Sequence, residues 1–167
     1  MASGDTLLVF TPGAASFPSS NAPTIDTRNN HMVLDFDDTT QETCYFTGVL
    51  PRHYGGGGLT ILLVWMAETA TTGNVEWETA IERHQDDVTD LDSDSFATAQ
   101  ASGAVACASV SGEPQYTETN THTSGAQMDS LAAGESFRLS VARDADDGTN
   151  DTMTDDAELM RVEIKET

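Results

Sequence analysis

The feature that most constrains the fold is an alternation of apolar and polar residues with a period of two. Residues 73–83 (GNVEWETAIER) show it most clearly. Their apolar face consists of Val75, Trp77, Thr79 and Ile81. Their polar face carries Asn74, Glu76, Glu78 and Glu82, which we expect to be in water. This period indicates a half-buried β-strand, because successive side chains of a strand point to opposite faces of its sheet.

Three further segments extend the pattern. Residues 136–143 place Phe137, Leu139 and Val141 inward. Residues 157–165 place Met160, Val162 and Ile164 inward, against Arg161, Glu163 and Lys165. Residues 59–66 (LTILLVWM) are apolar on both faces, so we expect a central strand that is covered on both sides.

Shorter candidate strands lie at 6–10, 31–36, 42–49, 104–110 and 114–121, with turn-forming Gly and Asn residues between them. Short helices are expected at 95–101 and 126–132. This spacing predicts an all-β fold, an antiparallel two-sheet β-sandwich of the jelly-roll type with about eight strands. The expected core includes Leu63, Trp77, Ile81, Phe137, Val141 and Val162.

The domain organisation expected is an N-terminal strand and extended arm over residues 1–27, followed by the jelly-roll domain over 28–167. Residues 11–24 (TPGAASFPSSNAPT) hold three prolines and many small residues. They are interpreted as an extended arm or a long crossing loop. The two cysteines, Cys44 and Cys107, are too few for a disulfide scaffold, and buried free thiols are favoured over a bridge.

The charge excludes several function classes. The 167 residues include 28 acidic and 7 basic ones, which gives a formal net charge of −21. Nucleic-acid binding requires a basic surface, and an anionic membrane would repel the chain, so neither partner is expected. No stretch approaches 18 apolar residues, so no membrane-spanning helix is expected. The acidic balance fits either a saline environment or a surface that resists aggregation.

The sequence offers only weak candidates for a metal site. Asp90, Asp92 and Asp94 alternate like calcium ligands, but Ser95 stands where the glycine of an EF-hand loop belongs. Asp144 and Asp146 begin a second acidic loop that also departs from that template. Both clusters are interpreted either as loose cation sites or as solvated loops.

Nothing in the sequence predicts catalysis or a cofactor. The histidines His31, His53, His84 and His122 are scattered, and we expect each in a turn or at the surface. Trp65 and Trp77 are expected in the core, which leaves Tyr54 and Tyr116 as the exposed rings that a sugar could stack on. The chain is therefore not expected to be an enzyme.

Two stretches carry a resemblance to a known group of proteins. They are FTGVLPRHYGGGGLTILLVWMAETATTGNVEWETAIER (46–83) and SFRLSVARDADDGTNDTMTDDAELMRVEIKE (136–166). In strand pattern and turn placement they resemble small jelly-roll structural proteins of tailed viruses of bacteria and archaea, and most of all the head decoration (cement) proteins.

This resemblance implies a homotrimer that binds the major capsid protein on the outer surface of the virion head. A receptor- or glycan-binding module of a tail or fibre is the alternative. Residues considered for contacts with the capsid or with neighbouring subunits are Phe10, Phe17, Pro18, Arg28 and Arg52.

Overall fold

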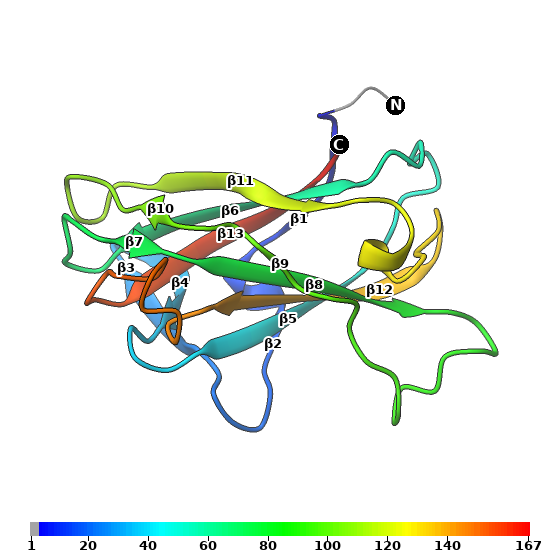
Figure 1. The fold of residues 1–167 in the computed structure, drawn as a ribbon, viewed down its shortest axis with the longest axis horizontal. Coiled ribbons are helices and arrows are strands. Elements are labelled where there is room, and N and C mark those ends of the chain that lie inside the picture. The colour runs from blue at the N-terminus through cyan, green and yellow to red at the C-terminus, as the bar shows by residue number, and fades with distance from the viewer. Residues whose placement is uncertain (1–3) are drawn as a thin grey trace.

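Two antiparallel β-sheets pack face to face (Figure 1). The computed structural model describes residues 4–167, except for the side chain of Thr119. Sheet 1 contains, in order, β11 (Gln115–His122), β6 (Leu59–Ala67), β13 (Ala157–Glu166), β4 (His31–Phe36) and β3 (Thr24–Arg28), with β1 (Thr6–Phe10) also paired to β13. Sheet 2 contains β2 (Ala15–Ser16), β5 (Glu42–Val49), β12 (Ser136–Arg143), β8 (Trp77–His84) and β9 (Gln100–Ala101).

The remaining elements are short. β7 (Asn74–Val75) pairs with β10 (Val105–Ala106), so the strand expected at 104–110 is reduced to two residues. The 3-10 turns η1 (Pro12–Ala14) and η2 (Ala126–Met128) are the helical elements of the described chain. The helix expected at 95–101 is wrong, because this segment runs extended beside β8. Neither turn is long or apolar enough to cross a membrane.

The strand order is that of a jelly roll. Sheet 1 contributes β4, β13, β6 and β11 as neighbours, and sheet 2 contributes β5, β12, β8 and β9. The chain alternates between the sheets from β4 to β5, β6 and β8, and again from β11 to β12 and β13. All pairings are antiparallel in the described residues, so the predicted β-sandwich is confirmed.

The core lies between the two sheets. The six residues expected there are fully buried: Leu63, Trp77, Ile81, Phe137, Val141 and Val162. The Trp77 ring meets Phe36 edge-on with ring centroids 5.1 Å apart, and it lies 6.0 Å from the Trp65 ring. The Trp65 indole N–H donates to the Thr117 hydroxyl at 2.9 Å, which satisfies the polar end of a buried ring.

The outward face of β8 differs from the expectation. Glu76 and Glu82 were expected in water but are only 4% and 1% exposed. The acidic loop 144–156 covers Glu76, and the loop after β8 covers Glu82. The loop after β8 places Phe96 in a stack on Tyr45 of β5, and Arg138 of β12 lies 4.8 Å from both rings and donates to Glu82 at 2.6 Å.

A β-bulge in β13 shifts the expected register. Leu159 faces Trp65 of β6, but the next paired residue is Arg161, opposite Val64. Met160 is therefore half-buried rather than a core residue, and Leu159 takes the inward position. A bulge inserts one extra residue into a strand, so the alternation before the bulge is out of step with the alternation after it.

Arg143, at the end of β12, is a completely buried cation. Its guanidinium donates to both carboxylate oxygens of Asp151, at 2.9 and 2.8 Å. It also donates to the carbonyl oxygens of Phe36, Met153 and Asp155. Since a guanidinium has five N–H donors, every one of them has a partner. Arg143 thereby fixes the acidic loop 144–156 to the end of β4.

The N-terminal segment crosses from one sheet to the other. β1 lies on β13, Pro12 is buried, β2 lies on the edge of β5, and β3 returns to sheet 1 beside β4. β3 and β4 form a hairpin whose loop residues Asn29 and Asn30 have positive φ values of 47° and 67°, as a tight type I′ turn requires. The segment thus lies against the sandwich at Pro12, β2 and Pro23, whereas residues 19–21 are exposed in the loop between β2 and β3. The first three residues of the proposed 1–27 segment lie outside the described residues, and its status as a separate unit stays a prediction.

Candidate functional site

The first acidic loop does not gather its carboxylates. Asp90, Asp92 and Asp94 all lie in the loop between β8 and β9. The Asp90 carboxylate accepts a hydrogen bond from the backbone N–H of Asp92, and the Asp90 carbonyl accepts one from Asp94. These bonds shape a turn. In the described chain, groups of three acidic ligand atoms within 4.8 Å of one another occur at two other places.

One of these groups includes a residue of the second acidic loop. Asp144 and Asp147 lie beside the buried Glu76, whereas Asp146 does not join them. Desolvation raises the pKa of Asp144, and the neighbouring Asp147 and Asp146 carboxylates raise it further. The pKa of Glu76 is also raised, chiefly by burial. Its neighbours Asp147 and Asn150 share hydrogen bonds with it.

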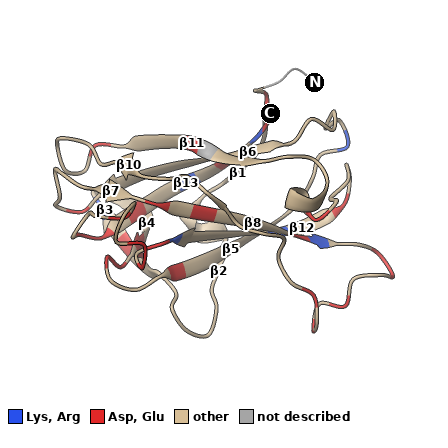
Figure 2. Ribbon diagram, in the orientation of Figure 1, with Lys and Arg blue, Asp and Glu red and all other residues tan. Residues whose placement is uncertain are grey.

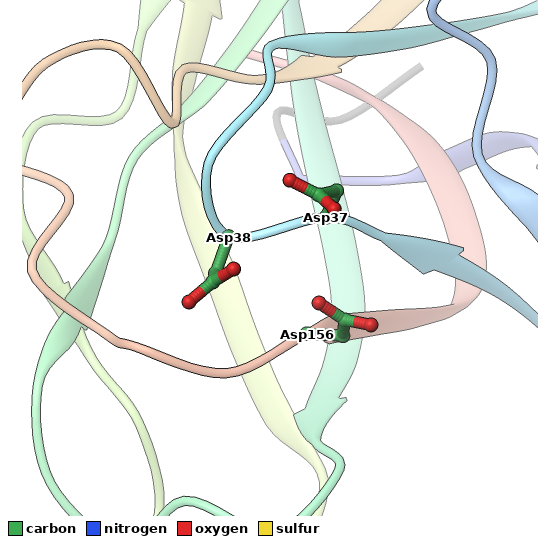
Figure 3. A group of neighbouring side chains, drawn as sticks. All are labelled: Asp37, Asp38 and Asp156. Atoms are coloured by element: carbon green, nitrogen blue, oxygen red, sulfur yellow. The ribbon is translucent and has the colours of Figure 1, made fainter.

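The other group was not expected from the sequence. Asp37 and Asp38 follow β4, and Asp156 precedes β13, so the fold joins segments far apart in the chain (Figure 3). The Asp37 carboxylate accepts three hydrogen bonds from Thr39 and Thr40, which lower its pKa. Desolvation raises the pKa of Asp156, and Asp37 and Asp38 add to this rise. Carboxylate oxygens at this spacing could hold a hard cation such as Ca²⁺.

Asp35 is the most perturbed acid beside this group. Its side chain leaves β4 on the outer face of sheet 1, and Oδ1 is buried without a hydrogen bond. Desolvation raises its pKa to about 7, and the charges of Asp156, Glu158, Glu68 and Asp26 act in the same direction. The nearby cation is Arg28, whose guanidinium donates to both oxygens of Glu158 and to the Glu68 carbonyl.

The residues considered for contacts do not form one surface. The Phe10 ring stacks on Phe46 with centroids 5.3 Å apart, so much of it belongs to the chain's own core. Phe17 is 39% exposed, and Pro18 is half-buried beside it. Arg28 is held at the end of β6, next to Glu68, whereas Arg52 is exposed in the loop that precedes the start of β6. The two arginines therefore lie at opposite ends of the sandwich.

A long segment without charge runs along one flank of the sandwich. Residues 6–25 contain no charged residue, although the chain has 28 acidic and 7 basic ones. Through β1, β2 and β3 they border both sheets. Phe17 and Ile25 are exposed on this flank by 39% and 58%, and Met32 on the neighbouring strand by 48%. We call residues 6–25, together with Met32, the uncharged flank. A second uncharged run, 95–112, borders β9 and β10 on the opposite side. Figure 2 shows the acidic residues gathered largely in loops.

One cluster has the residue types of a catalytic triad but not its geometry. The hydroxyl of Ser136 lies 3.4 Å from His84 Nδ1, and His84 Nε2 lies 3.5 Å from Glu82, beside a hollow of about 620 Å³. Both contacts are at the limit of hydrogen bonding, and Arg138 binds the same Glu82 oxygen at 2.6 Å. Ser136 lies in a strand that is paired on both sides, so the backbone N–H groups of this strand serve the sheet and not an oxyanion.

His122 corrects another expectation, because it is completely buried rather than at the surface. Its Nδ1 contacts the Gln127 carbonyl at 3.1 Å and must donate to it, so Nε2 accepts from the Thr79 hydroxyl at 2.9 Å. Desolvation lowers its pKa, and the ring is neutral. It ties β11 to β8 within the core.

The aromatic residues leave little for a sugar to stack on. Trp65 and Trp77 are buried, as expected. Tyr54 is half-buried, and its hydroxyl accepts the N–H of Gly58 and contacts the Met128 sulfur. Tyr116, which is 60% exposed, remains. Cys44 and Cys107 are free thiols, buried and half-buried respectively, and desolvation raises the pKa of both.

Comparisons with known proteins give little further guidance. No protein-family model and no curated protein matches this sequence. Among solved structures, a chain of "Structure of infectious bursal disease virus Gx strain" aligns with 98% of this chain at 9% identity and a TM-score of 0.32. The match covers 33% of that chain, so this protein spans about a third of its length. A likeness at this level does not inform the function of this chain.

Proposed function

We propose that this chain is a structural protein of a virion, a decoration protein that binds the outer surface of the head and stabilises the capsid lattice. The observation that carries the proposal is the uncharged flank on an otherwise strongly acidic jelly roll. A capsid surface can meet this flank without neutralising carboxylates, whereas a contact through the acidic loops would require a basic partner.

Two further features support a structural role. The resemblance of residues 46–83 and 136–166 to head decoration proteins rests on strand pattern, and the jelly-roll order agrees with that pattern. In the part of the chain that the structure describes, the one cluster with triad residue types lacks catalytic geometry. Fold alone does not imply function, so the flank carries the argument.

The flank also defines where attachment takes place. Phe17 and Ile25 are large exposed apolar side chains in a segment that otherwise consists mostly of Ser, Thr, Ala, Pro and Gly residues, although Asp26 directly follows Ile25. Buried apolar anchors within a neutral rim are typical of specific interfaces. The major capsid protein is the proposed partner, and Asp26 and Arg28 are the charged groups that follow the flank on β3.

The test uses heads from a virus that lacks this protein, incubated with purified chain and separated by sedimentation. Phe17→Asp and Ile25→Asp are expected to lower binding at least tenfold, because each places a charge in an apolar contact. Leu91→Asp is the matched control, since Leu91 is 61% exposed in the acidic loop 85–99. Deletion of residues 1–22 is less informative, because it would remove β1 from β13.

Equal binding by both flank variants and the wild type would contradict the proposal. So would localisation of the intact protein to the tail tip, which would favour the receptor-binding alternative.

A further inference from the structure

The outer face of sheet 1, which points away from sheet 2, has an unusual construction. Leu62, Val64 and Met66 of β6 point outward, yet they are only 3%, 4% and 4% exposed. The expected second covering layer is replaced here by long side chains from the neighbouring strands. The Arg161 guanidinium lies 5.8 Å from the Tyr116 ring, and the Lys165 ammonium pairs with Glu118. Both contacts join β13 to β11 across β6.

Apolar groups remain available on this face. Tyr116 is 60% exposed, and Val9, which is paired with Glu163, is 53% exposed. A hollow of about 340 Å³ lies nearby, lined in part by Met66, Met160 and Pro114. Tyrosine, methionine and arginine are enriched at protein–protein interfaces, and an exposed Tyr beside an Arg is a frequent energetic centre.

The charge balance of this face points to its occupant. On the part of this face that is formed by β11, β6 and residues 161–165 of β13, the charged residues are Glu118, Arg161, Glu163 and Lys165, two acids and two bases. Asp35 and Glu158 lie farther along the same face, on β4 and the first half of β13. The other 26 acidic and 5 basic residues carry the whole net charge of −21. Copies of so acidic a protein repel each other through most orientations, but not through a face with no net charge and with both signs present.

We propose that the part of the outer face of sheet 1 formed by β11, β6 and residues 161–165 of β13, centred on Tyr116 and Arg161, is the contact between copies of this chain in solution. The inference adds self-association to the proposed function, in line with the homotrimer that the resemblance implies, but it does not depend on what the assembled protein binds. The charges outside the face still repel at long range, so association strengthens when salt shortens the Debye length from about 10 Å at 0.1 M to about 3 Å at 1 M.

The experiment is sedimentation equilibrium of the purified chain at 0.1 and 1 M NaCl. The wild type is expected to give a multiple of the 17.8 kDa chain mass, with tighter association at high salt. Tyr116→Glu is expected to weaken association at least tenfold, because it removes the aromatic ring at the centre of the contact and adds a third acid to a surface with two bases. Leu91→Glu, in the loop 85–99, is the control and is expected to associate like the wild type.

Melting temperatures of both variants show whether each still folds. Tyr116→Ala provides a second variant without added charge, and it is also expected to weaken association. A wild type that is monomeric at both salt concentrations would overturn the inference, as would unchanged association of both Tyr116 variants. If the wild type is monomeric and Tyr116→Glu instead abolishes head binding, this face is a capsid contact and the inference is wrong. If Tyr116→Glu is monomeric and only Phe17→Asp fails to bind heads, the self-association proposal and the head-binding proposal are each supported independently.

Discussion

Replacing Arg143 by Met should be among the most damaging single changes in this chain. The guanidinium is completely buried and makes five hydrogen bonds, two to Asp151 and three to backbone carbonyls. Met replaces the aliphatic part of the arginine side chain but is shorter and has no donor. The variant therefore leaves a carboxylate with 2% side-chain exposure and three carbonyls without these partners.

Breaking a buried ion pair by removing one partner costs about 3–5 kcal/mol. The free energy of unfolding of a natural domain is about 5–15 kcal/mol, so Arg143→Met would lose a large part of the total stability. The assay is urea unfolding followed by tryptophan fluorescence, since Trp65 and Trp77 are both buried. Arg52→Met is the control, and because Arg52 is exposed we expect a change within about 0.5 kcal/mol.

A double-mutant cycle separates the charge from the packing. Adding Asp151→Asn to Arg143→Met removes the stranded charge and should recover about 1–2 kcal/mol of the loss. If Arg143→Met costs less than about 1 kcal/mol, or if the second change makes the protein still less stable, the assigned role of this pair is refuted.

Three further predictions concern stability. Asp35 has a folded-state pKa of about 7, against 3.8 for an unperturbed aspartate, so the fold favours its neutral form. Its contribution to the free energy of unfolding is therefore greatest below pH 4, falls as the pH rises to 7, and does not change further above pH 7. Asp35→Asn should therefore raise the free energy of unfolding at pH 8 by about 1–2 kcal/mol, which is less than the full pKa shift implies because the site is partly solvated. The variant should also show a weaker pH dependence of this free energy between pH 4 and 7, as measured by urea unfolding at each pH. Trp77→Ala should cost about 3–5 kcal/mol in the same assay, against about 0.5 kcal/mol or less for Thr47→Ala at the surface. The melting temperature should rise from 0.05 to 1 M NaCl, because screening weakens repulsion in a chain of net charge −21, and a flat or falling curve would show that repulsion does not limit stability.

The sequence alone was sufficient to predict which side chains point into the core, but not which outward-pointing side chains are buried. The period of two placed Trp77, Ile81 and Val162 correctly, because the core side of a strand is encoded in its own alternation. Glu76 and Glu82 were misplaced because loops from elsewhere in the chain cover them. Met160 was misplaced by a bulge that has no sequence mark.

The acidic groups show the same limit. Asp37, Asp38 and Asp156 come together only through the pairing of β4 with β13, which a local pattern does not contain. The paired acids Asp37-Asp38 and Asp155-Asp156 were the available signal, since each stands at the end of a candidate strand. The alternation in residues 136–143 places Arg143 on the inward face with Phe137, Leu139 and Val141, but at the end of a strand this position alone does not distinguish a buried cation from one that reaches the surface.

The position of β13 has a consequence for how the protein is made. β13 follows all the other described strands in the sequence, yet it pairs with β6 along one edge and with β4 and β1 along the other. While residues 157–166 are still inside the ribosome, sheet 1 is split, and β1, synthesised first, has no neighbour in it. At about 5–20 residues per second, the N-terminal strand waits roughly 8–30 s for its partner. A nascent chain truncated before β13 would expose the unpaired edges of β6 and β4, which makes incomplete translation products targets for aggregation or proteolysis.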